Sequence, residues 1–286
     1  MSTTDATLPS STVRTRVMGR ELVLARERLG LDRAAAAAVL HSPVDWLDAV
    51  EDGRLDVDRN TLARLLGAYR ADTRTHTRMM DLYGQPETGW LIQPHDIGEA
   101  DGVDAALLHE ATADDLFVYD ILSLPVFLRT ERYARELLAR DGNTTPAEVE
   151  QRLAAGLRRY RSFRPSSSSS TRRTFIVHEP TLRHLHGDRQ TIKEQLHHLA
   201  HLPARAAAVR VIPVSAPASY WEQVAFTLTK TRTHRPVVHV RTVSCTLFLD
   251  RPDLVEHYRD MATRLLEHAL SRTESHTLLL DLANPA

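Results

Sequence analysis

Three side chains in the segment 180–202 have the types and spacing of metal ligands. Glu194, His197 and His201 stand at positions i, i+3 and i+7, which places them on one face of a predicted helix, as carboxylate-histidine sites require. A di-iron bundle needs a second Glu-x-x-His motif, and the sequence has none. Because a histidine-rich helical face is more often a solvated surface, we expect no bound metal here.

Nucleophilic catalysis finds less support in the sequence. The single cysteine, Cys245, excludes an internal disulfide, and the pair that it would form with His239 lacks an orienting acid. The chain contains no G-x-S-x-G, Walker or G-x-G-x-x-G motif. We therefore assign no catalytic residue, expect no cofactor and favour a function other than catalysis.

Polar and aromatic residues of the C-terminal half are candidates for lining a ligand pocket. They are concentrated in the segments 117–133 and 219–241. Anchoring of the core, with the hydroxyl groups hydrogen bonded, is their more frequent role. The candidates are Tyr119, Asp120, Phe127, Arg129, Tyr133, Tyr220, Trp221, Glu222 and Arg241.

The overall charge limits what the chain can bind without specific contacts. It has 36 basic and 37 acidic residues, so it lacks the positive excess that attracts phosphate or anionic lipid. Any affinity for nucleic acid must therefore be local. No apolar run reaches the roughly 18 residues that cross a bilayer, and the N-terminus has no apolar signal core, so we expect a cytoplasmic protein without a membrane partner.

The elements that position these residues form two groups, and the first is helical. Residues 1–16 are a Ser/Thr-rich arm, and helical periodicity runs from 17 to 83. Breaks at Gly30 and Gly53 separate short helices, as a helix-turn-helix bundle requires. The predicted N-terminal caps are Asp32, Ser42, and either Asp58 or Asn60.

The second group follows a predicted linker, residues 84–104, which is rich in Gly, Pro and acids. Residues 105–286 then combine helices near 105–121, 130–141, 146–163, 180–202 and 252–272 with β-branched strands. These strands are TFIVHE, AVRVIPV, VAFTLTK, PVVHVRTV and CTLFLD. The predicted fold class is α+β, an N-terminal all-α helix-turn-helix bundle joined to a C-terminal domain of helices around a small, mainly antiparallel sheet.

The N-terminal segment ARERLGLDRAAAAAVLHSPVDWLDAVEDGRL resembles the lambda-repressor or XRE class of helix-turn-helix domains without a gap. The family signature I-x-x-I-E-x-G matches Leu47, Val50, Glu51 and Gly53. In that family an arginine of the first helix pairs with the signature glutamate. The resemblance therefore implies a structural ion pair between Arg26 and Glu51.

The remainder of the chain resembles the C-terminal domain of the actinobacterial WhiJ-like regulators. The resemblance is carried, in order, by YDILSLPVFLRTERYARELL, VHEPTLRHLHG, KEQLHHLAHL, VRVIPV and HALSRTESHTLLL. It implies a homodimer on operator DNA, and often a small acidic partner protein. The chain departs from the relatives at Val126, Arg129 and Arg241, where they tend to carry Gly, Gln and an acid.

The base-reading positions of the helix-turn-helix family depart as well. They match Val44, Asp45, Trp46 and Ala49, none of which makes a bidentate contact with guanine or adenine. Residues 17–71 hold eight arginines and nine acidic residues, so their formal net charge is −1, where a DNA-binding module is normally basic. Arg33 matches the family's phosphate contact, and Arg14 and Arg16 are the candidate arm residues.

Two functions from different classes remain open. The first is a helix-turn-helix transcriptional regulator of an actinobacterium, whose C-terminal domain binds an effector or partner protein. The second is a regulator scaffold that has lost DNA binding and serves specialised metabolism as a small-molecule binder or enzyme. The second predicts an apolar ligand pocket in the C-terminal domain. Protein-protein scaffolding is a third possibility that no residue excludes.

Overall fold

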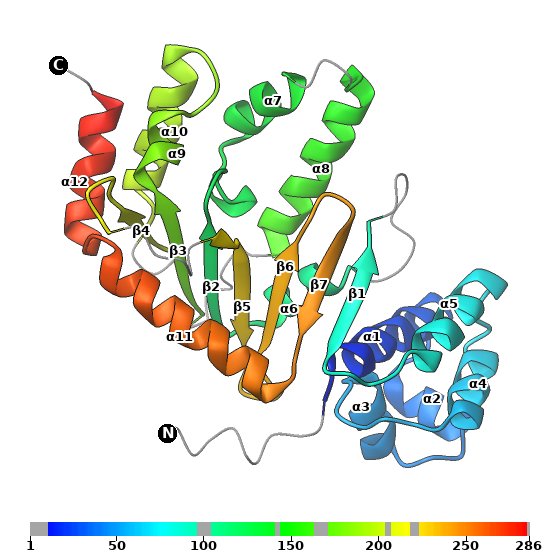
Figure 1. The fold of residues 1–286 in the computed structure, drawn as a ribbon. Coiled ribbons are helices and arrows are strands. Elements are labelled where there is room, and N and C mark those ends of the chain that lie inside the picture. The colour runs from blue at the N-terminus through cyan, green and yellow to red at the C-terminus, as the bar shows by residue number, and fades with distance from the viewer. Residues whose placement is uncertain are drawn as a thin grey trace. The chain divides into compact units, whose positions relative to one another are not determined.

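The computed structural model describes residues 11–95, 104–140, 144–162, 171–203, 207–217 and 223–284 (Figure 1). Contacts within the chain define two units. The first unit joins Met1–His109 to Lys230–Val255, and the second joins Glu110–Thr229 to Glu256–Ala286. Residues 230–255, which lie far along the sequence, are thus part of the same unit as the N-terminal helices.

The N-terminal helices of the first unit enclose an apolar core. They are α1 (Val13–Arg28), α2 (Arg33–Val39), α3 (Val44–Glu51), α4 (Arg59–Ala68) and α5 (Thr73–Gly84). The side chains at helical spacing in the sequence form this core. Its fully buried members include Leu22, Ala36, Leu47, Leu62, Leu65 and Met79.

Side chains of the turns fix where these helices begin. Asp32 caps α2 through the backbone N–H of Ala35, and Asp58 caps α4, as the sequence predicts. The prediction for α3 is wrong, because its N-cap is Pro43, while the Ser42 hydroxyl donates to the Leu40 carbonyl. Helix α1 begins four residues earlier than expected because Thr12 and Thr15 form a capping box.

Two glycines allow α1 and α3 to approach closely. Gly53 follows α3 with φ +68°, and a Cβ atom at this position would lie 2.5 Å from the Cα of Arg16. A Cβ atom at Gly19 of α1 would collide with the carbonyl of Glu51. The α1–α3 contact therefore depends on backbone atoms that a side chain would separate.

Three strands complete the first unit, in the order β1-β7-β6. Strand β1 (Trp90–Pro94) pairs antiparallel with β7 (Cys245–Leu249), which pairs antiparallel with β6 (Val237–Arg241). Strand β1 lies inside the segment 84–104 that the sequence presents as a linker. The start of α1 and the start of α6 (Ala105–Thr112) share one buried cluster with these strands. The cluster consists of Val13, Val17, Leu91, Ala105, Ala106, Val237 and Phe248.

The second unit has four strands in the order β5-β2-β3-β4. Strands β2 (Asp115–Asp120), β3 (Arg172–His178) and β4 (Ala208–Ile212) run parallel, and β5 is Phe226–Lys230. Between β2 and β3 lie the 3₁₀ turn η2 (Val126–Leu128), α7 (Glu131–Ala139) and α8 (Pro146–Ser162). Between β3 and β4 lie α9 (Glu179–Arg183) and α10 (Arg189–Ala200). Helices α11 (Pro252–His268) and α12 (Arg272–Ala283) end the chain, and α12 packs against α10 and β4.

The α+β class is confirmed, and all five predicted strands are present. The strands are mixed in direction, because crossover helices make β2, β3 and β4 parallel. The helix expected over 105–121 is wrong beyond Thr112, since Leu116–Tyr119 are four consecutive buried residues that form β2. The segment 180–202 holds two helices, and α12 is an additional one. None of the helices in the described residues is long and apolar enough to cross a membrane.

The close approach of α1 and α3 gives a test with a matched control. Gly30 has φ +67° and no atom near its missing Cβ, whereas Gly53 has the same backbone conformation against α1. We expect Gly53→Ala to lower the free energy of unfolding by about 2 kcal/mol more than Gly30→Ala, because only the first adds a steric collision to the backbone strain. Urea denaturation measures both. Equal losses would show that α1 does not constrain Gly53.

Candidate functional site

Glu51, at the C-terminal end of α3, is a buried carboxylate with three partners. Its side chain is fully buried, and Arg26 donates to it through Nε at 2.7 Å and Nη2 at 2.9 Å. The Tyr69 hydroxyl donates at 3.0 Å, and Arg33 Nε donates at 3.2 Å. The bidentate contact with Glu51 raises the pKa of Arg26, and burial together with the same carboxylate raises the pKa of Tyr69. Both groups therefore stay protonated.

The other acids at the C-terminal half of α3 are also paired with arginines. Asp48 lies 2.5 Å from Nη1 of Arg33 and 2.7 Å from Nη2 of Arg54. Asp52 accepts from Nε of Arg54 at 2.8 Å, and this bond is the main reason why the pKa of Arg54 is raised. These ion pairs are partly exposed, so each adds at most about 1 kcal/mol to stability. Their larger effect is to neutralise the surface of α3.

The N-terminal half of α3 presents exposed side chains that are not paired with arginines. Val44 is 44% exposed and Asp45 is exposed, and no hydrogen bond or ion pair joins the Asp45 side chain to another residue in the described ranges. Trp46 and Ala49 are half-buried, and Trp46 packs against the helical core. Asp45, Asp48 and Asp52 are spaced i, i+3 and i+7, so they share one face of α3. Of these three acids, Asp45 alone has no arginine beside it.

The two arginines expected in a DNA-contacting arm are engaged elsewhere. Arg14 lies 2.9 Å from both Asp56 and Glu87, and it donates to two backbone carbonyls near the end of α5. Arg16 is 7% exposed, and burial lowers its pKa to about 10. Both belong to the described part of the expected arm, whose residues 1–10 lie outside the described ranges. In this structure neither side chain is available as an arm contact.

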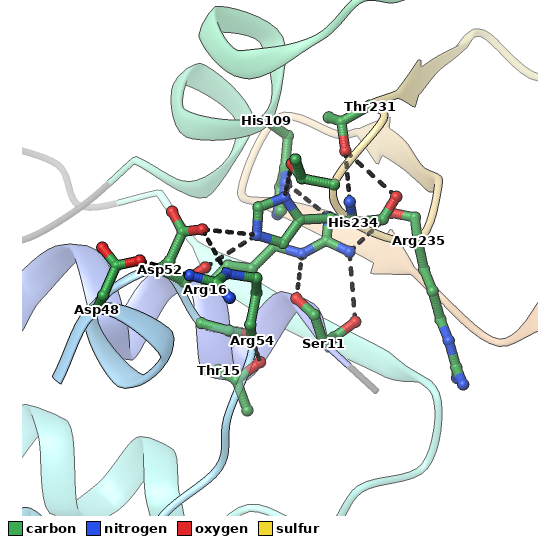
Figure 2. A network of polar contacts seen from close by, with 12 residues as sticks. Ser11, Thr15, Arg16, Asp48, Asp52, Arg54, His109, Thr231, His234 and Arg235 are labelled. Atoms are coloured by element: carbon green, nitrogen blue, oxygen red, sulfur yellow. Dashed lines mark hydrogen bonds and ion pairs between the residues drawn. The ribbon is translucent and has the colours of Figure 1, made fainter. Parts of the chain in front are cut away.

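Arg16 instead connects α1 to the turn between β5 and β6. It donates to the Arg235 carbonyl at 2.7 Å and to the Ser11 hydroxyl at 2.8 Å, and its Nη1 lies 3.5 Å from Nδ1 of His109 (Figure 2). An arginine has no acceptor, so Nδ1 of His109 must be unprotonated for this contact. Full burial, followed by the charge of Arg16, holds the pKa of His109 well below its usual range.

The same turn meets the C-terminal end of α3 through His234. Its Nε2 lies 2.9 Å from the Asp52 carbonyl, which only accepts, so Nε2 carries the proton. Its Nδ1 accepts from the Thr233 hydroxyl at 2.8 Å. Both nitrogens are thus satisfied in the neutral ring, and desolvation lowers the pKa of His234. Sequence reasoning missed this contact because its partners are 182 positions apart.

The described pocket candidates of the second unit are engaged in contacts with neighbouring residues, and none of them lines either of the two hollows described below. Tyr119 is buried and its hydroxyl lies 2.8 Å from Nε2 of His178. Asp120 accepts from the backbone and hydroxyl of Ser123, and Arg129 Nε donates to the Leu124 carbonyl. Burial lowers the pKa of Arg129 and raises that of Tyr133.

The remaining pocket candidates lie apart from that group. Phe127 is buried in the core of the second unit, and Arg241 is exposed at the end of β6 in the first unit. Tyr220, Trp221 and Glu222 lie outside the described residues.

Two small hollows are formed by described residues. One is lined by Thr12–Arg14, 85–91 and Asp250, and has a volume of about 30 Å³. The other, of about 40 Å³, is lined by α10, α12 and the start of β4. Roughly 10–15 Å³ of such space holds one water molecule, so each hollow has room for a few waters and is small for an organic ligand.

The metal and nucleophile candidates are engaged in ordinary contacts. Glu194 faces Nη1 of Arg132 at 3.3 Å and Nε2 of Gln190 at 2.7 Å. Nδ1 of His201 donates to the His197 carbonyl at 2.8 Å. Within the described ranges no three His, Cys, Asp or Glu side chains are grouped closely enough to hold a metal ion. Cys245 contacts the Thr242 hydroxyl, while His239 pairs with Phe248 in the β6–β7 ladder.

Comparison with known proteins finds two family models that match parts of the chain. Residues 17–79 match the sequence family described as a helix-turn-helix domain. Residues 103–281 match the family described as a domain of unknown function (DUF5753). No curated protein matches the chain. The exposed face of α3 therefore lies in the helix-turn-helix part, and the turn that contacts it lies in the part with the second match.

The buried histidines predict how stability depends on pH. The pKa values of His109 and His234 are lowered, so the unfolded chain binds more protons than the folded chain just below pH 6.5. The contribution of these neutral histidines to the free energy of unfolding is then fully present above pH 6.5. It falls as the pH drops, by up to about 1.4 kcal/mol per pH unit for each histidine. Urea midpoints at pH 7.5 and 5.5 measure this loss above the range in which carboxylates titrate.

The control compares one buried with one exposed histidine. His109→Gln should weaken the pH dependence, whereas His76→Gln, at an exposed position of α5, should leave it unchanged. An unchanged slope in His109→Gln would mean that His109 is not held neutral by the fold.

Proposed function

We propose that this chain, which belongs to the DUF5753 family and carries a helix-turn-helix domain at its N-terminus, binds DNA through helices α2 and α3 and acts as a transcriptional regulator. The observation that carries the proposal is the ion pairing of α3. Glu51, Asp48 and Asp52 each have an arginine within 3 Å, so these acids do not act as free negative charges toward phosphate.

The pairing resolves the apparent conflict between an acidic helix and an anionic ligand. An unpaired carboxylate beside phosphates repels them, whereas a carboxylate paired with arginine presents almost no net charge. Arg33 and Arg54 are partly exposed, and the phosphates compete with Asp48 for them. DNA binding should therefore be modest in strength and sensitive to salt.

Base contacts in this proposal come from the N-terminal half of α3. The Asp45 carboxylate accepts hydrogen bonds only, which suits the amine of cytosine, and Val44 suits the methyl group of thymine. Both side chains are exposed. This set differs from the Gln and Arg contacts that are usual for the fold, so the operator should be recognised through few direct contacts.

The finer assignment rests on the resemblance to WhiJ-like regulators. It adds a homodimer on operator DNA, and a C-terminal domain that responds to an effector or a small acidic partner protein. The competing proposal, a scaffold that has lost DNA binding, is favoured by one observation: Arg14, Arg16 and Arg33 all have protein partners. The two small hollows give no support to its ligand-binding part.

A titration by fluorescence anisotropy separates the two proposals. The full chain is titrated into labelled DNA from its own upstream region and into random-sequence DNA, at about 50 and 200 mM salt. A regulator should prefer the upstream region and lose affinity steeply with salt. A flat titration with both probes at about 50 mM salt would favour the scaffold.

Asp48 offers a second test, because it holds two arginines away from phosphate. Asp48→Asn should raise DNA affinity roughly three- to tenfold at about 50 mM salt, since it removes one negative charge and one of the two acidic partners of both Arg33 and Arg54, which keep Glu51 and Asp52. The matched control is Asp81→Asn, which removes the same charge from an exposed position of α5. Equal affinities of the two variants would contradict a role of α3 in binding DNA.

A further inference from the structure

The turn between β5 and β6 is the most basic short stretch beside α3. Its sequence, KTRTHR over residues 230–235, contains Lys230, Arg232, His234 and Arg235 and no acid. The chain as a whole is neutral, and residues 17–71 have a net charge of −1. Nothing in the local sequence requires this concentration of charge, because a tight turn between strands needs polar residues and not cations.

The contacts of His234 place this turn, named here the basic turn, at the end of the exposed face of α3. Nε2 of His234 bonds the Asp52 carbonyl at 2.9 Å and lies 4.0 Å from the Asp52 carboxylate. Asp52 is the last of the three acids on that face. Asp45 and Asp52 are seven residues apart, which is about 10 Å along a helix. The basic turn, which contacts Asp52, therefore lies at the opposite end of α3 from Asp45. Figure 2 shows the contacts of Asp52 with both Arg54 and His234.

The backbone of the basic turn is fixed by several hydrogen bonds. The Thr231 hydroxyl accepts from the backbone N–H of His234 at 2.8 Å and donates to its carbonyl at 3.2 Å. The carbonyl of Arg235 accepts from the buried guanidinium of Arg16. A turn that is ordered before binding loses less conformational entropy when it contacts a ligand.

The side chain of Arg235 is not part of this fixed network. Figure 2 shows it extending away from Arg16 and His234. No hydrogen bond or ion pair joins its guanidinium to another side chain among the described residues, and Arg232 is exposed. An ordered backbone that presents an unpaired guanidinium suits bidentate contact with phosphate.

We propose that the basic turn is a second DNA-contacting element, which binds backbone phosphates next to the bases that α3 faces. This inference rests on the proposed DNA-binding function. Lys230, Arg232 and Arg235 add three positive charges to the net charge of −1 of residues 17–71, giving +2 for the combined surface. The basic turn thus supplies the local positive charge that the helices within residues 17–71 lack. It belongs to the part of the chain that matches DUF5753.

The experiment uses the full chain and the salt dependence of its DNA affinity. The probe is a fluorescein-labelled random-sequence duplex, because phosphate contacts are independent of sequence. Each lost phosphate contact lowers the slope of log K against log salt by about 0.9. Arg235→Ala should lower it by about that amount, with affinity reduced several-fold at about 50 mM salt.

The matched control is Arg264→Ala, which removes an exposed arginine from α11 in the second unit. It should leave the slope unchanged. Circular dichroism and urea midpoints establish that all variants are folded, and because the Arg235 side chain has no role in the network, Arg235→Ala should keep the midpoint of the parent chain.

Three results would overturn the proposal, and they differ from one another. If the parent chain binds DNA and Arg235→Ala keeps its slope, the basic turn is not a contact, while the proposed function stands. If Arg264→Ala lowers the slope equally, the effect is one of net charge alone. If the parent chain gives a flat titration at about 50 mM salt, DNA binding itself fails, and the basic turn fails with it.

Discussion

The buried carboxylate of Glu51 is the constraint on which the N-terminal half of the molecule depends. A charge without water must be compensated by nearby partners, and removing one partner of such a pair costs roughly 3–5 kcal/mol. Here the partners come from three directions, since Arg26 belongs to α1, Arg33 to α2, and Tyr69 ends α4. Glu51 thereby fixes the three helices around α3.

The same requirement for compensation explains the surface of α3. Arg33 reaches both the buried Glu51 and the exposed Asp48, so the structural pair and the surface pair share one arginine. Arg54 then joins Asp48 to Asp52, and Asp52 meets His234 through its carbonyl. A continuous series of polar contacts thus runs from the core beneath α3 to the turn between β5 and β6. The acidic sequence of α3 is therefore consistent with a nearly neutral helix surface.

Periodicity and capping residues predicted the parts of the fold that depend on local sequence. Helices α1 to α4, the caps at Asp32 and Asp58, and five strands all follow from residues that are close in the chain. Strand β2 was missed because four consecutive buried residues fit a helix or a strand equally well. Strand β1 was missed because the glycines and prolines around it are typical of a linker, and its pairing with β7 is distant in sequence.

The site was less predictable than the fold, for a physical reason. Family resemblance named Arg26 and Glu51, and the structure places them 2.7 Å apart. The resemblance also named Arg33 as a phosphate contact, and the sequence offered Arg14 and Arg16 as arm residues. No local pattern reveals that an arginine is already occupied by an acid or a carbonyl. The partners of Arg16 and His234 lie 219 and 182 positions away. Contacts of this kind depend on the tertiary structure alone.

Hydrogen exchange in the presence of DNA tests the central claim most directly. The account predicts that a random-sequence duplex at low salt slows the exchange of backbone amides in α3 and in residues 230–235 together, because both face the same phosphates. Amides in β2, β3 and β4 should exchange at unchanged rates. Protection that is absent from both segments, or confined to the second unit, would contradict the account.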